Sequence, residues 1–467
     1  MNILILEHNK DRERLRYEFI VERLKEMSPD SKAEIHPFDN AMEIALAFPP
    51  DVILSHPVRD EIGATVMTAL KLLYHCKIVC LTTEGLDNIN LPEAADIRLG
   101  SFNYSEKLID FYFYWGEKTK EFYLRNLLER KRVSDPDRVG LSGYVLFEKE
   151  TVEKYINKYG IGSEVKEFTR NYEKNYCFVT AAFKMHDPIE EAEKSEILRK
   201  DMPREEYERI KQNVLRKSDY RYEYGKRYLA FLGHLAEKHP NYGFLVKLHP
   251  IEISTNRQDE MYEFLTIYKN IFFIKEPLLM PAVLNQVDGL FHYGSSTAVE
   301  AYLYKVPTVR LYMKGEGEDA FVNSMGDRYE YELSETLTTI FDLDAIVYSS
   351  NRKMEQYLID FFGYRENRPY HPTKTVVLEL IGGKDRQDIS FEEGINSEIM
   401  KNDVALSLRM VLYKRILQYV KRGKWNKIRE LFIRLKTIQP RRFGMVRDFI
   451  AKVKMSMHSE SRGDTLN

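Results

Sequence analysis

The chain reads Gly243-Phe-Leu-Val-Lys-Leu-His-Pro250 and, further along, Gly289-Leu-Phe-His-Tyr-Gly-Ser-Ser-Thr-Ala-Val-Glu-Ala301. Each stretch begins as a short apolar run, which predicts a buried strand, and ends abruptly in polar residues. In an open α/β sheet, ligands bind outside the carboxyl ends of the strands. The two stretches therefore predict an α/β sheet with one anionic site shared by two strand ends.

The residues before this pair repeat the alternation of strand and helix. Strands are expected at 2–6, 51–55, 77–81, 111–116 and 138–143, and helices at 11–27 and 62–74; a further strand is expected after the quoted pair, at 306–312. This alternation predicts a parallel sheet that is covered by helices on both faces. Since a second such unit starts near Tyr176, the expected fold is α/β, with two Rossmann-like doubly wound domains that face each other across a cleft.

Domain limits follow from the length and from shifts in the pattern. A chain of 467 residues is expected to hold more than one core. We expect an N-terminal domain at 1–150, a second domain at 170–350 and a helical, basic C-terminal extension at 351–467. The segment 187–228 is dense in Glu, Lys and Arg, which predicts an exposed helical pair followed by a separate helix over 228–238.

The composition argues against several classes of protein. The net charge is −2, so the overall charge offers no attraction to nucleic acid. The 3 cysteines lack metal-ligand spacing, which favours a reducing, cytoplasmic location. No apolar run is long enough to span a bilayer. The basic residues between 414 and 442 leave two interpretations open: a solvated helical face, or peripheral contact with a polyanion such as the inner face of the cytoplasmic membrane.

The candidate phosphate site consists of residues at the two quoted strand ends. Pro250 stops its strand, so His249 is presented at the sheet edge, where its imidazole can donate to a phosphate oxygen. Hydroxyls and free backbone N–H groups at the start of the helix after the second strand either bind an anion or simply cap that helix. Glu300 is placed to reach ribose hydroxyls or to favour the helix dipole. The predicted nucleotide-binding residues are Lys247, His249, Gly294, Ser295, Ser296, Thr297 and Glu300.

Polar residues also follow two strands of the first domain. Glu84 comes shortly after the strand at 77–81, so its carboxylate could take a proton from an acceptor hydroxyl, or else cap a turn. His56 follows the strand at 51–55 and borders the same predicted cleft. The candidate catalytic residues are therefore Glu84 and His249, and the candidate acceptor contacts are His56, Arg59 and Thr83.

These motifs carry a resemblance to a known family. Glu84-Gly85, His249-Pro250 and Ser295-Ser296 resemble the acidic-Gly, His-Pro and Ser-Ser/Thr motifs of bacterial sialyltransferases and capsule Kdo transferases. With Trp115-Gly116 and Val139-Gly-Leu-Ser-Gly143, residues 1–350 resemble bacterial surface carbohydrate biosynthesis proteins of GT-B fold. Thr83 departs from the family, whose motif often has a second acidic residue there.

The resemblance implies a glycosyltransferase. In that family the His-Pro histidine and the paired hydroxyls hold the phosphate of a CMP-activated donor, and the acidic residue serves the acceptor. For this chain it implies transfer of a Kdo-like or sialic-acid-like sugar to a glycan or lipid-linked glycan acceptor. No cofactor is expected, and the lack of a convincing Asp-x-Asp motif predicts independence of metal. CDP-glycerol glycerophosphotransferases share a similar core, so transfer of glycerol phosphate stays open, as does a scaffold without activity.

Overall fold

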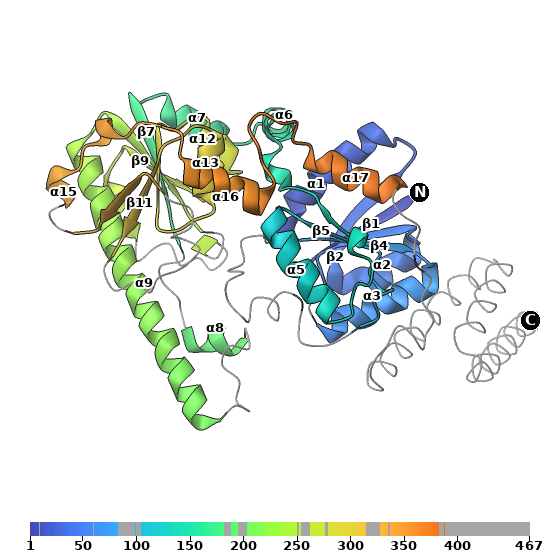
Figure 1. Ribbon diagram of the computed structural model, residues 1–467. Helices are drawn as coiled ribbons and strands as arrows, with labels where there is room; N and C mark the ends of the chain where they lie inside the picture. Colours follow the sequence, from blue (N-terminus) through green and yellow to red (C-terminus); the bar gives the residue numbers. More distant parts are fainter. Residues whose placement is uncertain are drawn as a thin grey trace, which may run out of the picture.

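The chain folds into two parallel sheets of six strands each, with helices on both faces (Figure 1). This confirms the predicted α/β fold with two Rossmann-like domains. The computed structural model describes residues 1–8, 10–58, 60–82, 99, 104–181, 188–194, 203–249, 252–253, 262–275, 279–313, 327–334, 337–382 and 387. Three predicted site residues, Arg59, Thr83 and Glu84, lie outside these residues, as does the basic segment 414–442.

The first sheet has the strand order β2-β1-β3-β4-β5-β6. Its strands are β1 (Asn2–Glu7), β2 (Lys32–Pro37), β3 (Val52–Ser55), β4 (Lys77–Leu81), β5 (Phe111–Tyr114) and β6 (Val139–Leu141). Its helices are α1 (Lys10–Met27), α2 (Ala41–Ala47), α3 (Glu61–Tyr74) and α5 (Glu117–Glu129), with 3-10 turns η1 (Phe38–Asn40), η2 (Pro136–Arg138) and η3 (Val145–Phe147). In β1, Ile3 and Ile5 join one buried cluster and Leu4 and Leu6 the other, so both faces of the sheet are covered.

The second sheet has the strand order β12-β11-β10-β7-β8-β9. Its strands are β7 (Lys174–Val179), β8 (Tyr242–Lys247), β9 (Ile271–Ile274), β10 (Gly289–His292), β11 (Thr308–Tyr312) and β12 (Tyr329–Glu332). The helices α6 (Lys149–Tyr159) and α7 (Ser163–Thr169) lead into it, and further elements are α8 (Pro188–Lys194), α9 (Arg204–Lys238), η4 (Glu263–Ile267), α12 (Met280–Leu284), α13 (Thr297–Leu303), α15 (Leu337–Ile340) and η5 (Leu343–Ala345).

The charged segment differs from its prediction. Two helices, α8 and α9, do pack on each other, but α9 continues unbroken for 35 residues and includes the predicted separate helix at 228–238. No residue of α9 before Tyr224 is buried, and Figure 1 shows this half extending away from the sheet. Gly225 and Gly233 lie inside this helix without ending it, and α9 contains no Pro. Among the described residues, no helix combines the length and apolar character needed to cross a bilayer.

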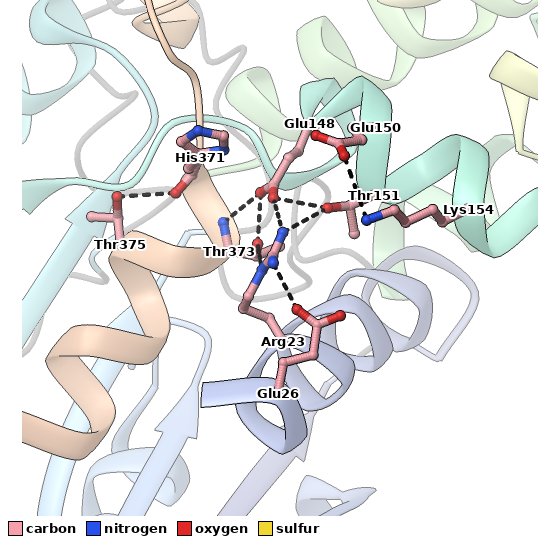
Figure 2. Close-up of polar contacts among 9 residues, drawn as sticks. All are labelled: Arg23, Glu26, Glu148, Glu150, Thr151, Lys154, His371, Thr373 and Thr375. Carbon is pink, nitrogen blue, oxygen red and sulfur yellow. Dashed lines mark hydrogen bonds and ion pairs between the residues drawn. The ribbon is translucent and has the colours of Figure 1, made fainter. Parts of the chain in front are cut away.

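After the second sheet, the chain returns to the first domain. The helix α16 (Arg352–Phe362) packs on α5 and α13, and α17 (Pro372–Gly382) packs on α1 (Figure 1). A buried carboxylate holds α17 in place: Glu148 accepts from the N–H and the hydroxyl of Thr373 at 2.9 and 2.6 Å, and from Arg23 at 2.8 Å (Figure 2). The predicted domain limits stay a prediction, but these last two described helices add to the packing of the first domain.

The two domains meet at an aromatic cluster. Trp115, Tyr144 and Phe147 of the first domain pack with Ala298 and Val299 of α13 in the second. The cluster also includes residues of α16, which touches α13 on one side and α5 on the other. Because α13 follows directly after the Gly-Ser-Ser turn, this interface places the first domain close to the predicted donor site.

Candidate functional site

The two stretches that suggested a shared site end at the same edge of the second sheet. The strand β7 pairs with β8 on one side and with β10 on the other, all in parallel. Neighbouring strands lie about 4.8 Å apart, so the ends of β8 and β10 are separated by roughly 10 Å. The chain runs outward from β7 to β8 and β9 in one direction and from β10 to β11 and β12 in the other. The point between β7 and β10 is therefore the switch point at which open α/β sheets bind ligands.

Three ionisable residues at this edge influence one another electrostatically. Burial lowers the pKa of Lys247, at the end of β8, although Cys177 and Glu300 oppose the shift. Burial raises the pKa of Glu300 to about 7, against the opposing effects of Lys247 and Arg16. Lys247 and Glu300 are predicted site residues, whereas Arg16 comes from α1 of the first domain and was not predicted. Lys247 and Arg16 thus both favour the ionised form of Glu300, while burial favours the protonated form.

The position of Arg16 is determined by the aromatic cluster between the domains. Its guanidinium carbon lies 5.0 Å from the ring centroid of Tyr144 and 5.6 Å from that of Trp115. Its Nη2 donates to the Tyr144 hydroxyl at 3.0 Å. A guanidinium held by two aromatic faces and a hydrogen bond loses little further freedom when it meets an anion. Arg16 is thus a preorganised cation at the domain interface.

A buried carboxylate holds the backbone of His249. The His249 N–H donates to Thr180 Oγ1 at 2.8 Å and to Glu252 Oε2 at 3.0 Å. Glu252 is 3% exposed and also accepts from the hydroxyls of Thr180 and Tyr262, the latter at 2.8 Å. Glu252 was not predicted. It lies three residues after His249 and accepts from the His249 N–H, which is the spacing of a capping box, and this spacing is the signal that could have identified Glu252.

The Gly-Ser-Ser turn differs from its prediction, which expected free backbone N–H groups. The Ser295 N–H donates to His292 Nδ1 at 3.3 Å, and the Thr297 N–H donates to Ser295 Oγ at 3.3 Å. The hydroxyls of Ser295 and Thr297 are hydrogen-bonded to each other. The Ser295 and Thr297 N–H groups, which were expected to bind an anion, therefore donate to acceptors within the turn itself. The turn therefore offers hydroxyl groups to a ligand, and Ser296 is its exposed residue.

The histidine beneath this turn is part of a buried support. His292 is 0% exposed and its Nε2 lies 3.1 Å from Asp327 Oδ1, which also accepts from the Thr308 hydroxyl at 2.7 Å. Burial alone would raise the pKa of Asp327, but the contacts with His292, Thr308 and Arg310 outweigh it and lower the pKa. Since Nδ1 of His292 accepts the Ser295 N–H, its Nε2 carries the proton that Asp327 accepts. The support thus fixes the orientation of the turn.

The first domain contributes fewer of the predicted residues. His56 follows β3 and is 4% exposed, with its Nδ1 2.9 Å from the carbonyl oxygen of Pro57. Thr82, the last described residue before the predicted Thr83 and Glu84, accepts from Trp115 Nε1 at 2.9 Å through its carbonyl oxygen. The chain therefore enters the predicted Glu84 segment directly beside the aromatic cluster at the domain interface.

Comparison with known proteins gives distant likenesses to solved structures at low sequence identity. No protein-family model and no curated protein sequence matches the chain. The UDP-GlcNAc 2-epimerase of Neisseria meningitidis bound to UDP-GlcNAc is 14% identical, with a TM-score of 0.47 over 82% of this chain and 100% of that chain. MnaA of S. aureus with UDP is 11% identical, with a TM-score of 0.47 over 81% of this chain and 95% of that chain. Likenesses this distant say nothing about substrate or reaction.

Proposed function

We propose that the protein is an enzyme that acts on nucleotide sugars, and more specifically a glycosyltransferase of surface polysaccharide assembly. The donor is nucleotide-activated, with a CMP-linked Kdo-like or sialic-acid-like sugar as the first case to test. The observation that carries the proposal is the position of Lys247 at the end of β8 and of Glu300 in α13, the helix after β10, at the switch point of the second sheet. A cation and a carboxyl group at this place suit a nucleotide, whose phosphate and ribose hydroxyls need one partner of each kind.

The donor phosphate is held by residues of both domains. Lys247 and Arg16 supply positive charge, and His249 and the hydroxyls of Ser295 and Ser296 donate hydrogen bonds. In the reaction, an acceptor hydroxyl attacks the anomeric carbon of the donor, and the bond from that carbon to the phosphate oxygen breaks. The electron pair leaves with the nucleotide, so the groups that stabilise its phosphate carry most of the rate enhancement.

The proton of the acceptor hydroxyl needs a base, and Glu84 remains the proposed one. Its segment follows Thr82, whose carbonyl oxygen is held by Trp115 at the domain interface. In this proposal the first domain supplies the base, and the second domain holds the donor phosphate. This division of labour matches the assignment of the acceptor to the first domain and the donor to the second.

The test is release of nucleotide from activated sugars, measured for CMP-, CDP- and UDP-linked donors. His249→Ala is expected to lower the rate by about 10²-fold, because one charged or hydrogen-bonding group at the leaving phosphate is lost. His239→Ala is the matched control: His239 ends α9 and its ring stacks on Tyr242 with centroids 5.2 Å apart. If CDP-glycerol is the only donor that is turned over, the protein is a glycerol-phosphate transferase and not a glycosyltransferase. Lack of turnover with every donor would favour a scaffold.

We also propose that the reaction needs no cofactor and no metal ion. Lys247 and Arg16 can neutralise the charge of the departing phosphate, the task a divalent cation performs in other transferases. Nucleotide release after treatment with EDTA should therefore stay within about twofold of the untreated rate, whereas removal of one such cation costs far more. A rate that collapses with EDTA and returns with Mg²⁺ or Mn²⁺ would contradict this.

A further inference from the structure

The first sheet has a switch point of its own, and two histidines flank it. From β1 the chain order runs to β2 on one side and to β3 on the other. The strands β1 and β3 are parallel and in register from Ile3–Val52 to Leu6–Ser55. His8 follows the last residue of β1, and His56 follows the last residue of β3. Ligands bind at such a point in open α/β sheets, so this edge is a candidate second site.

The side chains at this edge form a connected set. His8 Nε2 lies 3.2 Å from the hydroxyl of Ser55, the last residue of β3. The His8 ring stacks on Phe38 with centroids 4.2 Å apart and meets the His56 ring edge-on at 6.1 Å. Ser55 and His56 are 0% and 4% exposed, whereas His8 is exposed. A buried hydroxyl and an aromatic platform thus hold an imidazole that faces solvent.

The carboxylates beside His8 are engaged in fixing the backbone there. Glu7 accepts from Nε and Nη2 of Arg14 at 2.8 and 2.5 Å, which is a bidentate pair. Glu13 accepts from the His8 N–H at 2.7 Å. Both carboxylates are 3% exposed. The edge therefore presents the His8 imidazole with a fixed backbone behind it, and neither Glu7 nor Glu13 adds an exposed negative charge.

This edge is linked to the donor side by the helix that follows it. The helix α1 begins at Lys10, directly after β1, and Arg16 lies within its second turn. Arg16 bonds to Tyr144, which packs with Ala298 and Val299 of α13. The helices that follow the two switch-point strands, α1 after β1 and α13 after β10, thus approach each other at the domain interface.

We propose that His8, Ser55 and His56 form the acceptor site, in which the His8 imidazole binds a hydroxyl group of a glycan. This inference rests on the proposed function and adds to it the place and chemistry of acceptor recognition. An imidazole nitrogen can donate to or accept from a sugar hydroxyl, and stacking on Phe38 keeps the ring in one orientation. His8 binds the acceptor and Glu84 remains the proposed base, so His8 governs acceptor affinity rather than departure of the nucleotide.

The experiment measures nucleotide release with water alone and with a panel of methyl glycosides, for wild type, His8→Asn and His36→Asn. The control residue His36 lies on β2 and pairs with Glu34 at 2.9 Å. His8→Asn is expected to raise the acceptor KM by roughly tenfold, the effect of one lost hydrogen bond. The rate of His8→Asn with water and its affinity for CMP should match those of wild type. His36→Asn should leave the acceptor KM, the rate with water and the affinity for CMP unchanged.

The outcomes separate this inference from the proposed function. If wild type releases nucleotide but His8→Asn keeps the acceptor KM of wild type, the acceptor site is wrong and the proposed function stands. If His8→Asn loses CMP affinity instead, His8 belongs to the donor site. If wild type acts on no donor, both fail. Should His8→Asn not fold, the imidazole proton resonance of His8 in wild type, assigned through Ser55→Ala, must shift on addition of the glycosides, and an unchanged resonance would contradict the inference.

Discussion

Glu300 is the residue whose charge state affects the donor site most directly. Burial raises its pKa to about 7, even though Lys247 and Arg16 both favour the ionised form. Near neutral pH a small change in proton concentration therefore alters the net charge that a ligand phosphate meets. When this carboxyl is protonated, the phosphate meets Lys247 and Arg16 without the negative charge of Glu300, so the structure favours binding at slightly acidic pH.

The first prediction concerns the free energy of unfolding as a function of pH. The folded protein holds the Glu300 proton more tightly than the unfolded chain, in which the pKa is near 4.5, so the raised pKa makes wild-type stability fall as pH rises from about 4.5 to about 7. Glu300→Gln replaces this titrating carboxyl group with an amide that does not titrate. Relative to wild type, it should gain roughly 2–3 kcal/mol between pH 5 and pH 8, at about 1.4 kcal/mol per pKa unit.

Urea unfolding at pH 5 and pH 8 measures this difference. Glu129→Gln serves as the control, because Glu129 is an exposed residue at the end of α5. CMP affinity gives an independent readout: in wild type it should weaken from pH 6 to pH 8, and in Glu300→Gln it should not. Parallel pH profiles for wild type and Glu300→Gln would show that Glu300 does not titrate in this range.

At the scale of elements, the turn after β8 depends on one buried carboxylate. Glu252 accepts hydrogen bonds from the backbone of His249 and from two hydroxyls, those of Thr180 and Tyr262. Thr180 follows β7, whereas Tyr262 immediately precedes η4, so Glu252 joins three segments that are far apart in the sequence. The direction in which His249 leaves the sheet edge is therefore set by Glu252.

The second prediction is that Glu252→Ala is strongly destabilising. It leaves the buried hydroxyls of Thr180 and Tyr262 without this acceptor, and each such loss costs about 1–3 kcal/mol, so the free energy of unfolding should fall by more than about 2 kcal/mol. Affinity for CMP should fall too, because His249 loses its support. The control is Glu263→Ala, at an exposed residue of η4. A Glu252→Ala protein as stable as Glu263→Ala would contradict the assignment.

The third prediction concerns the return of α17 to the first domain, where Thr373 and Thr375 form a matched pair (Figure 2). The Thr373 hydroxyl donates to the buried Glu148 carboxylate at 2.6 Å, whereas the Thr375 hydroxyl donates to the His371 carbonyl at 3.1 Å within its own segment. Thr373→Val should lower the free energy of unfolding by roughly 1–3 kcal/mol. Thr375→Val should change it by about 0.5 kcal/mol or less, as is usual at exposed sites. Equal melting temperatures for the two variants would show that Glu148 does not anchor α17.

Across the whole molecule, the strands predicted from sequence, apart from the edge strand β6, lie inside a sheet. Their residues are buried on both faces, so each reads as a short apolar run. The strands β2, β9 and β12 were not predicted, and all three lie at the edge of a sheet. Their burial is partial, and β2 and β12 contain charged residues at alternate positions, which hides the apolar signal.

The candidate site divides in the same way. Lys247, His249 and the Ser295 turn were identified because each follows a recognisable buried strand. Arg16 could not be identified from its position in the sequence, because it lies within an amphipathic helix and reaches the donor side only through the packing of the domains. Asp327 contacts His292 from 35 residues further along the chain, and a pattern of neighbouring residues cannot predict such a contact.

The central claim is that the carboxyl edge of the second sheet binds the phosphate of a nucleotide. The most direct measurement is thermal unfolding of wild type and Lys247→Met with CMP, CDP and UDP, each compared with its nucleoside. A nucleotide at about 100 times its Kd should stabilise wild type by about 2.7 kcal/mol, and its nucleoside should do so less. Lys247→Met, which keeps the length of the side chain without its charge, should lose most of this shift. If no nucleotide raises the melting temperature of wild type, or if Lys247→Met responds as wild type does, the account is contradicted.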